Sequence, residues 1–163
     1  MSEGAQPGAE VIIRGAVPED AAAVASVLYE SFAEYEPSYT PEGFAATVSD
    51  PEQVRGRIER EPVWVAVKDG KIVGTVGAVP KGDALYVRSM AVVPAARGGA
   101  VGRRLMEQVE EFAADQGFGR MFLSTTPFLT SAIRLYERAG FRRSPEGPHD
   151  LFGTPLFTMV KDS

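Results

Sequence analysis

Apolar residues change their spacing several times along the chain, and each change predicts a different kind of element. Short runs rich in β-branched and aromatic residues, bounded by turn-forming residues, are typical of strands. This pattern predicts strands over Val11–Arg14, Val63–Val67, Ile72–Val79, Leu85–Val93, Met121–Thr126, Phe141–Arg143 and Leu156–Lys161. The tight turn Lys68–Lys71 joins the second and third of them, so we expect a hairpin there.

Spacings of three and four residues between apolar positions predict helices that bury one face. We expect them over Pro18–Phe32, over Glu52–Arg60, from Val101 to the stop at Gly117, and over Thr130–Ala139. Residues 37–51 contain several prolines and hydroxyl residues, and they are interpreted as a loop with room for a helical turn around Phe44–Val48.

The order of these elements predicts an α/β fold, a mixed sheet of about seven strands with about four helices on its faces. A length of 163 residues fits one domain, which we place at residues 11–163 after a disordered tail over residues 1–10. A long turn-rich connection over residues 145–155 would either cover an acceptor site or contact a second subunit.

Composition excludes several kinds of site and partner. The chain has no cysteine and a single histidine, His149, which excludes a disulfide framework and a polyhistidine metal site, and no metal is expected. The formal net charge of -5 disfavours nucleic acid as a partner. No apolar run is long enough for a membrane span and no export signal is recognisable, so we expect no membrane contact and a cytoplasmic location.

The segment after the fourth predicted strand carries the strongest chemical signal. It reads Arg97-Gly98-Gly99-Ala100-Val101-Gly102-Arg103 and opens a helix. The first amides of a helix have no intrahelical partner, and glycines allow a ligand to approach the backbone closely, so the segment predicts a phosphate-binding loop. Its glycine spacing matches neither a nucleotide P-loop nor a dinucleotide-binding fingerprint. The alternative is an ordinary turn followed by a solvated, basic helix start.

This segment resembles the cofactor loop of the GNAT acyltransferase superfamily, which reads Arg/Gln-x-x-Gly-x-Gly/Ala before a helix. Ala100 stands where glycine is usual. A second likeness follows about 35 residues later, where Leu135-Tyr136-Glu137 precedes Gly140-Phe141, similar to the tyrosine-bearing helix end of that family. Many relatives have an asparagine at the position of Leu129.

The resemblance implies a donor site for acetyl-CoA. In that family two adjacent parallel strands splay apart, and the pantetheine arm enters between them. Backbone contacts are then expected from Met90, Ala91 and Val92, and pyrophosphate contacts from Arg97, Gly98, Gly99, Ala100, Val101, Gly102 and Arg103. Further cofactor contacts are expected from Ser124, Thr125, Thr126 or Ser131. Tyr136 would act as general acid towards the departing sulfur; otherwise it is a core aromatic residue.

The resemblance leaves the general base open, because residues 85–89 carry no carboxylate. The candidates are Glu30, Glu34, His149 or a chain of water molecules, and we favour water. Glu30, Glu34, Tyr35 and Tyr86 are the expected acceptor contacts, since carboxylates and aromatic faces both suit a cationic amine. A solvated helix face is the alternative for the acidic residues.

The expected function is that of an acetyl-CoA-dependent N-acyltransferase that passes an acetyl group directly to an amine on a small molecule or peptide. The alternative is a noncatalytic module of the same fold that binds acyl-CoA or a protein partner. Homodimers are common in the family, so a homodimer is also expected.

Overall fold

The computed structural model describes residues 10–162, and the predicted tail lies outside this part except for its last residue. The described residues form eight strands: β1 Val11–Gly15, β2 Val63–Lys68, β3 Lys71–Lys81, β4 Ala84–Val92, β5 Arg120–Thr125, β6 Arg142–Arg143, β7 His149–Leu151 and β8 Thr154–Asp162. They also form five α-helices: α1 Ala21–Phe32, α2 Pro41–Thr47, α3 Pro51–Arg60, α4 Val101–Gln116 and α5 Thr130–Arg138.

The strands form one mixed sheet, which confirms the predicted fold class. Their order is β1-β2-β3-β4-β5-β8-β6, and β7 also pairs with β8. Only β4 and β5 run parallel to each other; the other described pairs are antiparallel. The chain between β4 and β5 contains α4, because a parallel pair needs a crossover connection.

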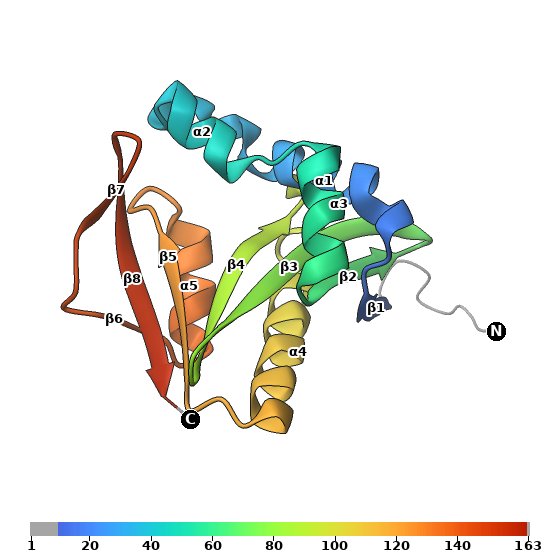
Figure 1. Ribbon diagram of the computed structural model, residues 1–163. Coiled ribbons are helices and arrows are strands. Elements are labelled where there is room, and N and C mark those ends of the chain that lie inside the picture. The colour runs from blue at the N-terminus through green and yellow to red at the C-terminus, as the bar shows by residue number, and fades with distance from the viewer. Residues whose placement is uncertain (1–9, 163) are drawn as a thin grey trace.

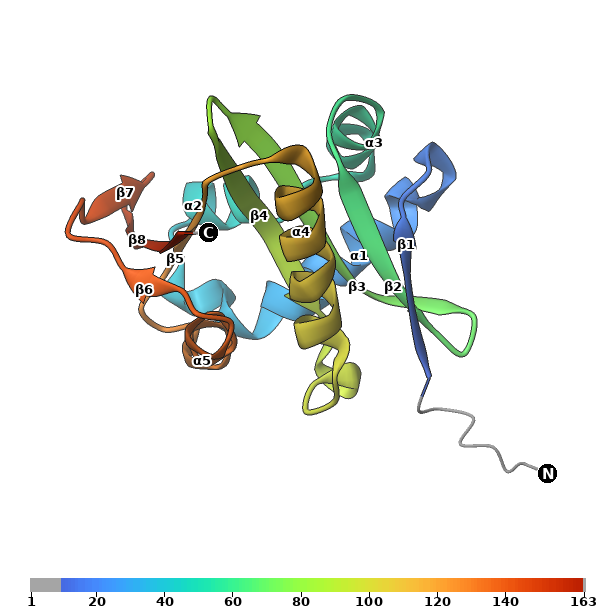
Figure 2. The same ribbon diagram turned by 90° about the horizontal axis from the view of Figure 1, so that it is seen from below.

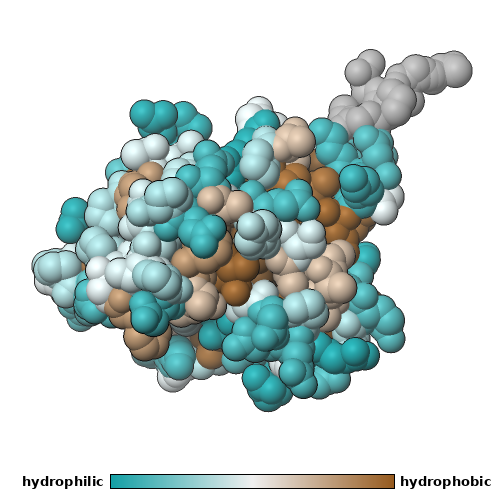
Figure 3. All heavy atoms as spheres, turned by 90° about the horizontal axis from the view of Figure 1, so that it is seen from above, coloured by the Kyte–Doolittle hydropathy of each residue, from teal (hydrophilic) through white to brown (hydrophobic). Residues whose placement is uncertain are grey.

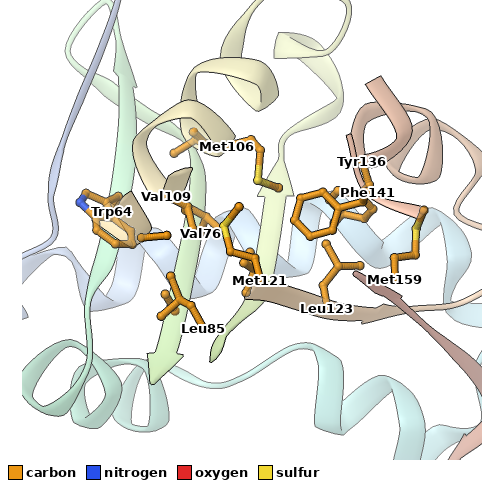
Figure 4. Packing of buried hydrophobic residues seen from close by; sticks show 14 of the residues in the cluster. Trp64, Val76, Leu85, Met106, Val109, Met121, Leu123, Tyr136, Phe141 and Met159 are labelled. Atoms are coloured by element: carbon orange, nitrogen blue, oxygen red, sulfur yellow. The ribbon is translucent and has the colours of Figure 1, made fainter. Parts of the chain in front are cut away.

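Helices cover both faces of the sheet (Figure 1). Residues of α1 and α3 pack on one face around Leu28, Val54 and Val65. On the other face, α4 and α5 enclose the larger core, and Figure 2 views this layer from below. Figure 4 shows that core between Trp64 at one end and Tyr136 with Phe141 at the other. The sheet therefore separates two layers of helices, and a gap between two of its strands would connect these layers.

The sheet opens between β4 and β5. These strands pair only over Ala84–Tyr86 and Arg120–Phe122, although β4 continues to Val92 and β5 to Thr125. On its other edge, β4 stays paired with β3 as far as Val92. The splayed parallel pair expected from the resemblance is thus present, and it leaves one edge of β4 without a strand partner beyond Tyr86.

A β-bulge interrupts β4 where it leaves β5. Arg88 pairs with Gly77 and Ala91 pairs with Thr75, so Ser89 and Met90 both lie opposite Val76. Ser89 has a φ of +57°, which is uncommon for a residue with a side chain. Such a bulge changes the direction in which the following N–H and C=O groups point, and here these groups lie on the edge of β4 that has no strand partner.

Two elements exceed the predicted numbers of strands and helices. Helix α2 lies in the middle of the predicted loop and begins before the helical turn expected around Phe44–Val48. Thr40 caps its first turn by accepting a hydrogen bond from Gly43 N, and Pro41 fits that turn. Strand β7 lies inside the predicted connection of residues 145–155. The residues of its turn, Phe152 and Gly153, both have positive φ, as a two-residue hairpin requires.

Candidate active site

The predicted phosphate loop connects β4 to α4 through the 3-10 turn Pro94–Ala96. Gly98 has a φ of +84°, a conformation that favours glycine. Ala100 is the N-cap of α4, with a φ of −94°, so alanine at this position introduces no backbone strain. No side chain caps the helix. The first amides of α4 therefore remain open for a ligand.

A cleft of about 670 Å³ lies beside this loop. Its walls come from the end of β4, the loop, and the facing sides of α4 and α5. A Cβ atom on Gly102 would come within 3.0 Å of Leu135 Cδ2, so the glycine allows the two helices to approach each other here. The predicted cofactor residues that line the cleft are Met90, Ala91, Val92, Arg97, Gly98, Gly99, Gly102, Arg103 and Ser131.

The other predicted cofactor residues do not line this cleft. Val101 is buried in the core, where it anchors the first turn of α4. Ala100 is the N-cap of that helix. Ser124 and Thr125 lie at the end of β5. Thr125, Thr126 and Ser31 are buried, and their hydroxyl groups have no hydrogen-bond partner among the described residues. Buried hydroxyls without a partner are costly. Of the three, Ser31 lines the cleft and could bond a ligand there.

Positive charge predominates along the cleft. Its lining contains Arg97, Arg103, Arg134, Arg138 and Lys161, against Glu107 and Glu110. Arg103 forms an ion pair with Glu107, and Lys161 forms one with Glu110. Arg134 and Arg138 of α5 form no ion pair within the described part of the chain. Sequence reasoning missed these two arginines, although their spacing of four residues could have placed them on one helix face.

Arg97 connects the loop to the first helix. Its Nη1 donates to Glu34, its Nη2 donates to the Ser31 carbonyl at 2.7 Å, and its Nε donates to the Val92 carbonyl at 3.3 Å. Glu34 was predicted as an acceptor contact or base, but the structure pairs it with this cofactor-loop arginine. The pair forms because the start of the loop lies against the end of α1, and the acceptor role of Glu34 stays a prediction.

Tyr136 lies at the inner end of the site rather than on the lining of the cleft. Its side chain is 7% exposed, and its ring packs edge-on against Phe141 at 6.2 Å between centroids. Burial, and to a smaller extent the nearby phenols of Tyr39 and Tyr86, raise the pKa of Tyr136 well above its usual value. Tyr136 is therefore protonated at neutral pH and can act as a hydrogen-bond donor.

Aromatic residues gather near the end of the β4–β5 pairing and beside the cleft. Tyr86 stacks on Phe122 at 5.0 Å, where β4 and β5 separate. Tyr35 lines the cleft and packs against Phe128 at 6.0 Å. Tyr39 also packs against Phe128, and burial raises its pKa. This wall keeps Tyr35 and Tyr86 as candidate acceptor contacts, and it adds Tyr39, which the acceptor prediction had not included.

The remaining predicted residues lie apart from the cleft. Glu30 is exposed on α1 and accepts a hydrogen bond from Ser26. His149 is exposed on β7 and does not line the cleft, so the structure provides no support for it as a base. Among the described residues, no group of three or more acidic or histidine side chains is arranged to hold a metal ion.

The structure thus combines a mixed sheet that splays at its parallel pair with a basic cleft between α4 and α5. The pattern of the Acetyltransferase (GNAT) family matches residues 25–141. The chain belongs to this family.

Relatives and solved structures agree with this assignment. The chain is 33% identical over 138 residues to "Uncharacterized N-acetyltransferase YjgM" of Escherichia coli K12, covering 80% of this chain and 81% of that protein. It is 42% identical over 84 residues to "Probable N-acetyltransferase camello" of Xenopus tropicalis, but this match spans only 38% of that protein. The PaiA N-acetyltransferase of Thermoplasma acidophilum, solved with coenzyme A, shares the fold with a TM-score of 0.80 at 18% identity, covering 94% of this chain and 99% of that one.

Proposed function

We propose that this protein is an acetyl-CoA-dependent N-acetyltransferase that transfers the acetyl group directly to an amine. One observation carries the proposal: pairing of β4 with β5 stops at Tyr86, and a basic cleft of about 670 Å³ adjoins the part of β4 that is left free. Tyr86 and Phe122 lie where the pairing ends, and they alternate with core residues of the α4 and α5 layer, so their side chains face the other layer. A donor and an acceptor can therefore meet from opposite sides.

The residues present fit coenzyme A. The open amides of α4 suit a pyrophosphate, and Arg134 and Arg138 are available for further phosphate charge. Beyond Tyr86, backbone groups on the free edge of β4 have no strand partner, so they can pair with an extended chain as another strand would. Ser31 adds a hydroxyl group that no described residue uses.

The chemistry supplied by acetyl-CoA is that of a thioester: the amine nitrogen attacks the carbonyl carbon, the C–S bond breaks, the nitrogen loses a proton and the sulfur gains one. A preorganised backbone amide on the free edge of β4 would stabilise the negative charge that develops on the carbonyl oxygen. The Tyr136 hydroxyl would donate to the sulfur. Its raised pKa disfavours complete proton transfer, so the neutral phenol would act as a hydrogen-bond donor.

No described carboxylate is an evident base at the opening, since Glu34 pairs with Arg97 and Glu61 pairs with Arg88. We propose that the proton of the amine leaves through water. The acetyl group as the natural acyl group, an amine on a small molecule or peptide as acceptor, a cytoplasmic location and a homodimer stay predictions. Within residues 10–162, no helix has both the length and the hydropathy that crossing a membrane requires.

The test combines acetyl-CoA binding with acceptor-dependent thiol release. We expect acetyl-CoA to raise the Tm, because a ligand that binds only the folded state stabilises it. Tyr136→Phe should lower kcat about 10- to 100-fold, the range for losing a hydrogen bond to a charged group, with a smaller effect on acetyl-CoA affinity. Tyr29→Phe, which alters an exposed phenol on α1, is the matched control and should change neither quantity.

Three outcomes are informative. Unchanged turnover of Tyr136→Phe, under conditions where chemistry limits the rate, would remove the assigned role of the phenol. Binding of acetyl-CoA without thiol release from any acceptor would favour the noncatalytic module. Absence of any Tm shift at millimolar acetyl-CoA, in protein shown to be folded, would refute the donor site itself.

A further inference from the structure

Arg57 of α3 is a half-buried cation without an acidic partner. Its Nη2 donates to Ser49 at 2.6 Å, and its Nη1 donates to Ser89 at 3.3 Å. Within residues 10–162, no carboxylate lies close enough to form an ion pair with it. A guanidinium has five N–H donors, and the two serine hydroxyls use only two of them. The charge and the remaining donors are therefore available to an anion.

A second arginine lies beside it. Arg88 of β4 pairs with Glu61 at 2.6 Å, so this carboxylate is already used by one guanidinium group. Burial, and next the charge of Arg88, lower the pKa of Arg57 from its usual value. An arginine stays protonated at neutral pH even so. Two cations with one carboxylate leave a net positive charge in a partly dry location, which an additional carboxylate would neutralise.

The location links this charge to the reaction centre. Ser89, which accepts from Arg57, is the bulge residue of β4, and the next residue, Met90, lines the donor cleft. Burial raises the pKa of Tyr86, on the same strand, and the charges of Arg88 and Arg57 offset this rise to a smaller extent. Tyr86 in turn affects the pKa of Tyr136. Arg57 therefore contacts the strand residue that directly precedes the lining of the cleft.

This part of the molecule belongs to the acceptor face. Arg57, Ser49 and Ser89 lie with α1 and α3, on the opposite side of the sheet from α4 and its phosphate loop. Seen from above, apolar side chains gather near the middle of that face, and polar side chains surround them (Figure 3). A ligand that reaches Arg57 would approach the opening from the side opposite to the donor.

We propose that the acceptor carries a carboxylate group, which Arg57 binds beside Arg88 while the amine of the acceptor faces the opening between β4 and β5. The acceptor class is then a small amino acid or a molecule of the same chemistry, with amine and carboxylate in one compact unit. This inference rests on the proposed function, because it names the substrate class of the same site.

The experiment compares each amino acid with its own carboxamide. Glycine, β-alanine and the proteinogenic amino acids are assayed for acetyl-CoA-dependent thiol release beside the matching amides. For accepted substrates we expect kcat/KM of the carboxylate form to exceed that of the amide about 10- to 100-fold, as for hydrogen bonds to charged groups. A ratio near one or below would overturn the proposal.

Variants identify the residue responsible. Arg57→Gln should reduce the ratio to about one. Arg55→Gln removes a cation from the exposed side of the same helix, where Arg55 approaches Glu59 at 4.0 Å, and should keep the ratio of the wild-type protein. If Arg57 only fastens Ser49 to the β4 bulge, Arg57→Gln would lower both substrate forms equally and leave the ratio intact. Arg57→Lys, which keeps the charge but not the planar fork, should give an intermediate ratio and replaces Arg57→Gln if that variant does not fold.

A binding arm separates the two proposals. If acetyl-CoA binds and no acceptor is turned over, the enzymatic function fails, and the panel is repeated as Tm shifts with N-acetylated amino acids and their amides. Shifts by the carboxylates with wild-type protein but not with Arg57→Gln would still support the carboxylate site. Equal shifts, or none, would overturn it.

Discussion

The conformation of Gly98 allows a sharp test of the phosphate loop. Its φ is +84°, and a Cβ atom added there would meet no atom within 4 Å. Gly98→Ala therefore introduces backbone strain without a clash. Left-handed backbone costs a residue with a side chain about 1–2 kcal/mol relative to glycine, so this is the whole perturbation.

That strain can lower either the free energy of unfolding or the affinity for coenzyme A. If the loop keeps its conformation in the free protein, the variant loses about 1–2 kcal/mol of unfolding free energy and its coenzyme A affinity is unchanged. If the loop relaxes, binding must restore the positive φ, and the Kd rises by about 5- to 30-fold, the same energy expressed as affinity. Because Gly98 is exposed and lies before α4, we expect most of the strain to appear as lost affinity.

Gly82→Ala is the matched control. Gly82 has a φ of +66° and equally open surroundings, but it lies in the turn between β3 and β4 and does not line the cleft. It should lose stability and keep its affinity. Calorimetric titration with coenzyme A and urea unfolding measure the two quantities. If Gly98→Ala matched the wild-type protein in both, the assigned loop geometry would be refuted; an affinity loss of similar size in Gly82→Ala would show that the effect is not local.

Two further predictions concern charge. Arg134→Gln should weaken coenzyme A binding about 2- to 5-fold at low salt and less at high salt, because salt screens an exposed cation. Arg103→Gln should lose less coenzyme A affinity, since Arg103 already pairs with Glu107. Equal losses of affinity in the two variants would contradict this account. The hydrogen bond from Arg14 lowers the pKa of Asp20, so the stability that it provides is present above the unfolded pKa of about 3.9 and is lost as the pH falls through the lower folded value. Asp20→Asn should therefore lower the free energy of unfolding by about 1 kcal/mol at pH 7, and the difference from the wild-type protein should vanish in acid. Urea unfolding at several pH values measures this difference, and a difference that stays constant with pH would refute the account.

Local signals predicted the strand, loop and helix start that border the cleft. The loop from Arg97 to Arg103 combines a strand end, glycines and a helix start in one stretch, so each feature depends on neighbours in the sequence. Helix α2 could also have been found, since Thr40-Pro41 is a helix start signal of the same kind. Only a helical turn around Phe44–Val48 was predicted, because the prolines of this region were interpreted as loop residues.

The acceptor side depends on contacts that no local pattern contains. Arg97 meets Glu34 from 63 positions away, and Arg57 meets Ser89 from 32 positions away. The bulge at Ser89 has a positive φ without glycine, so nothing in the sequence marked it. These features follow from the register of β3 against β4 and from the packing of α1 and α3. Sequence reasoning could propose acidic residues near an amine, but it could not show that Glu34 was already paired.

The two edges of β4 would allow the proposed donor and acceptor to be positioned independently. One of its edges is held by β3 through the bulge to Val92, while the other edge is free beyond Tyr86. A free edge supported by a paired one is rigid before any ligand arrives, so amides on it need not reorganise when charge develops on a carbonyl oxygen. The bulge turns the strand between Arg88 and Ala91, and Arg57 contacts its central residue from the opposite layer. A substitution at Arg57 should therefore change the kcat/KM for the acceptor, and a substitution at Gly98 should change the affinity for coenzyme A.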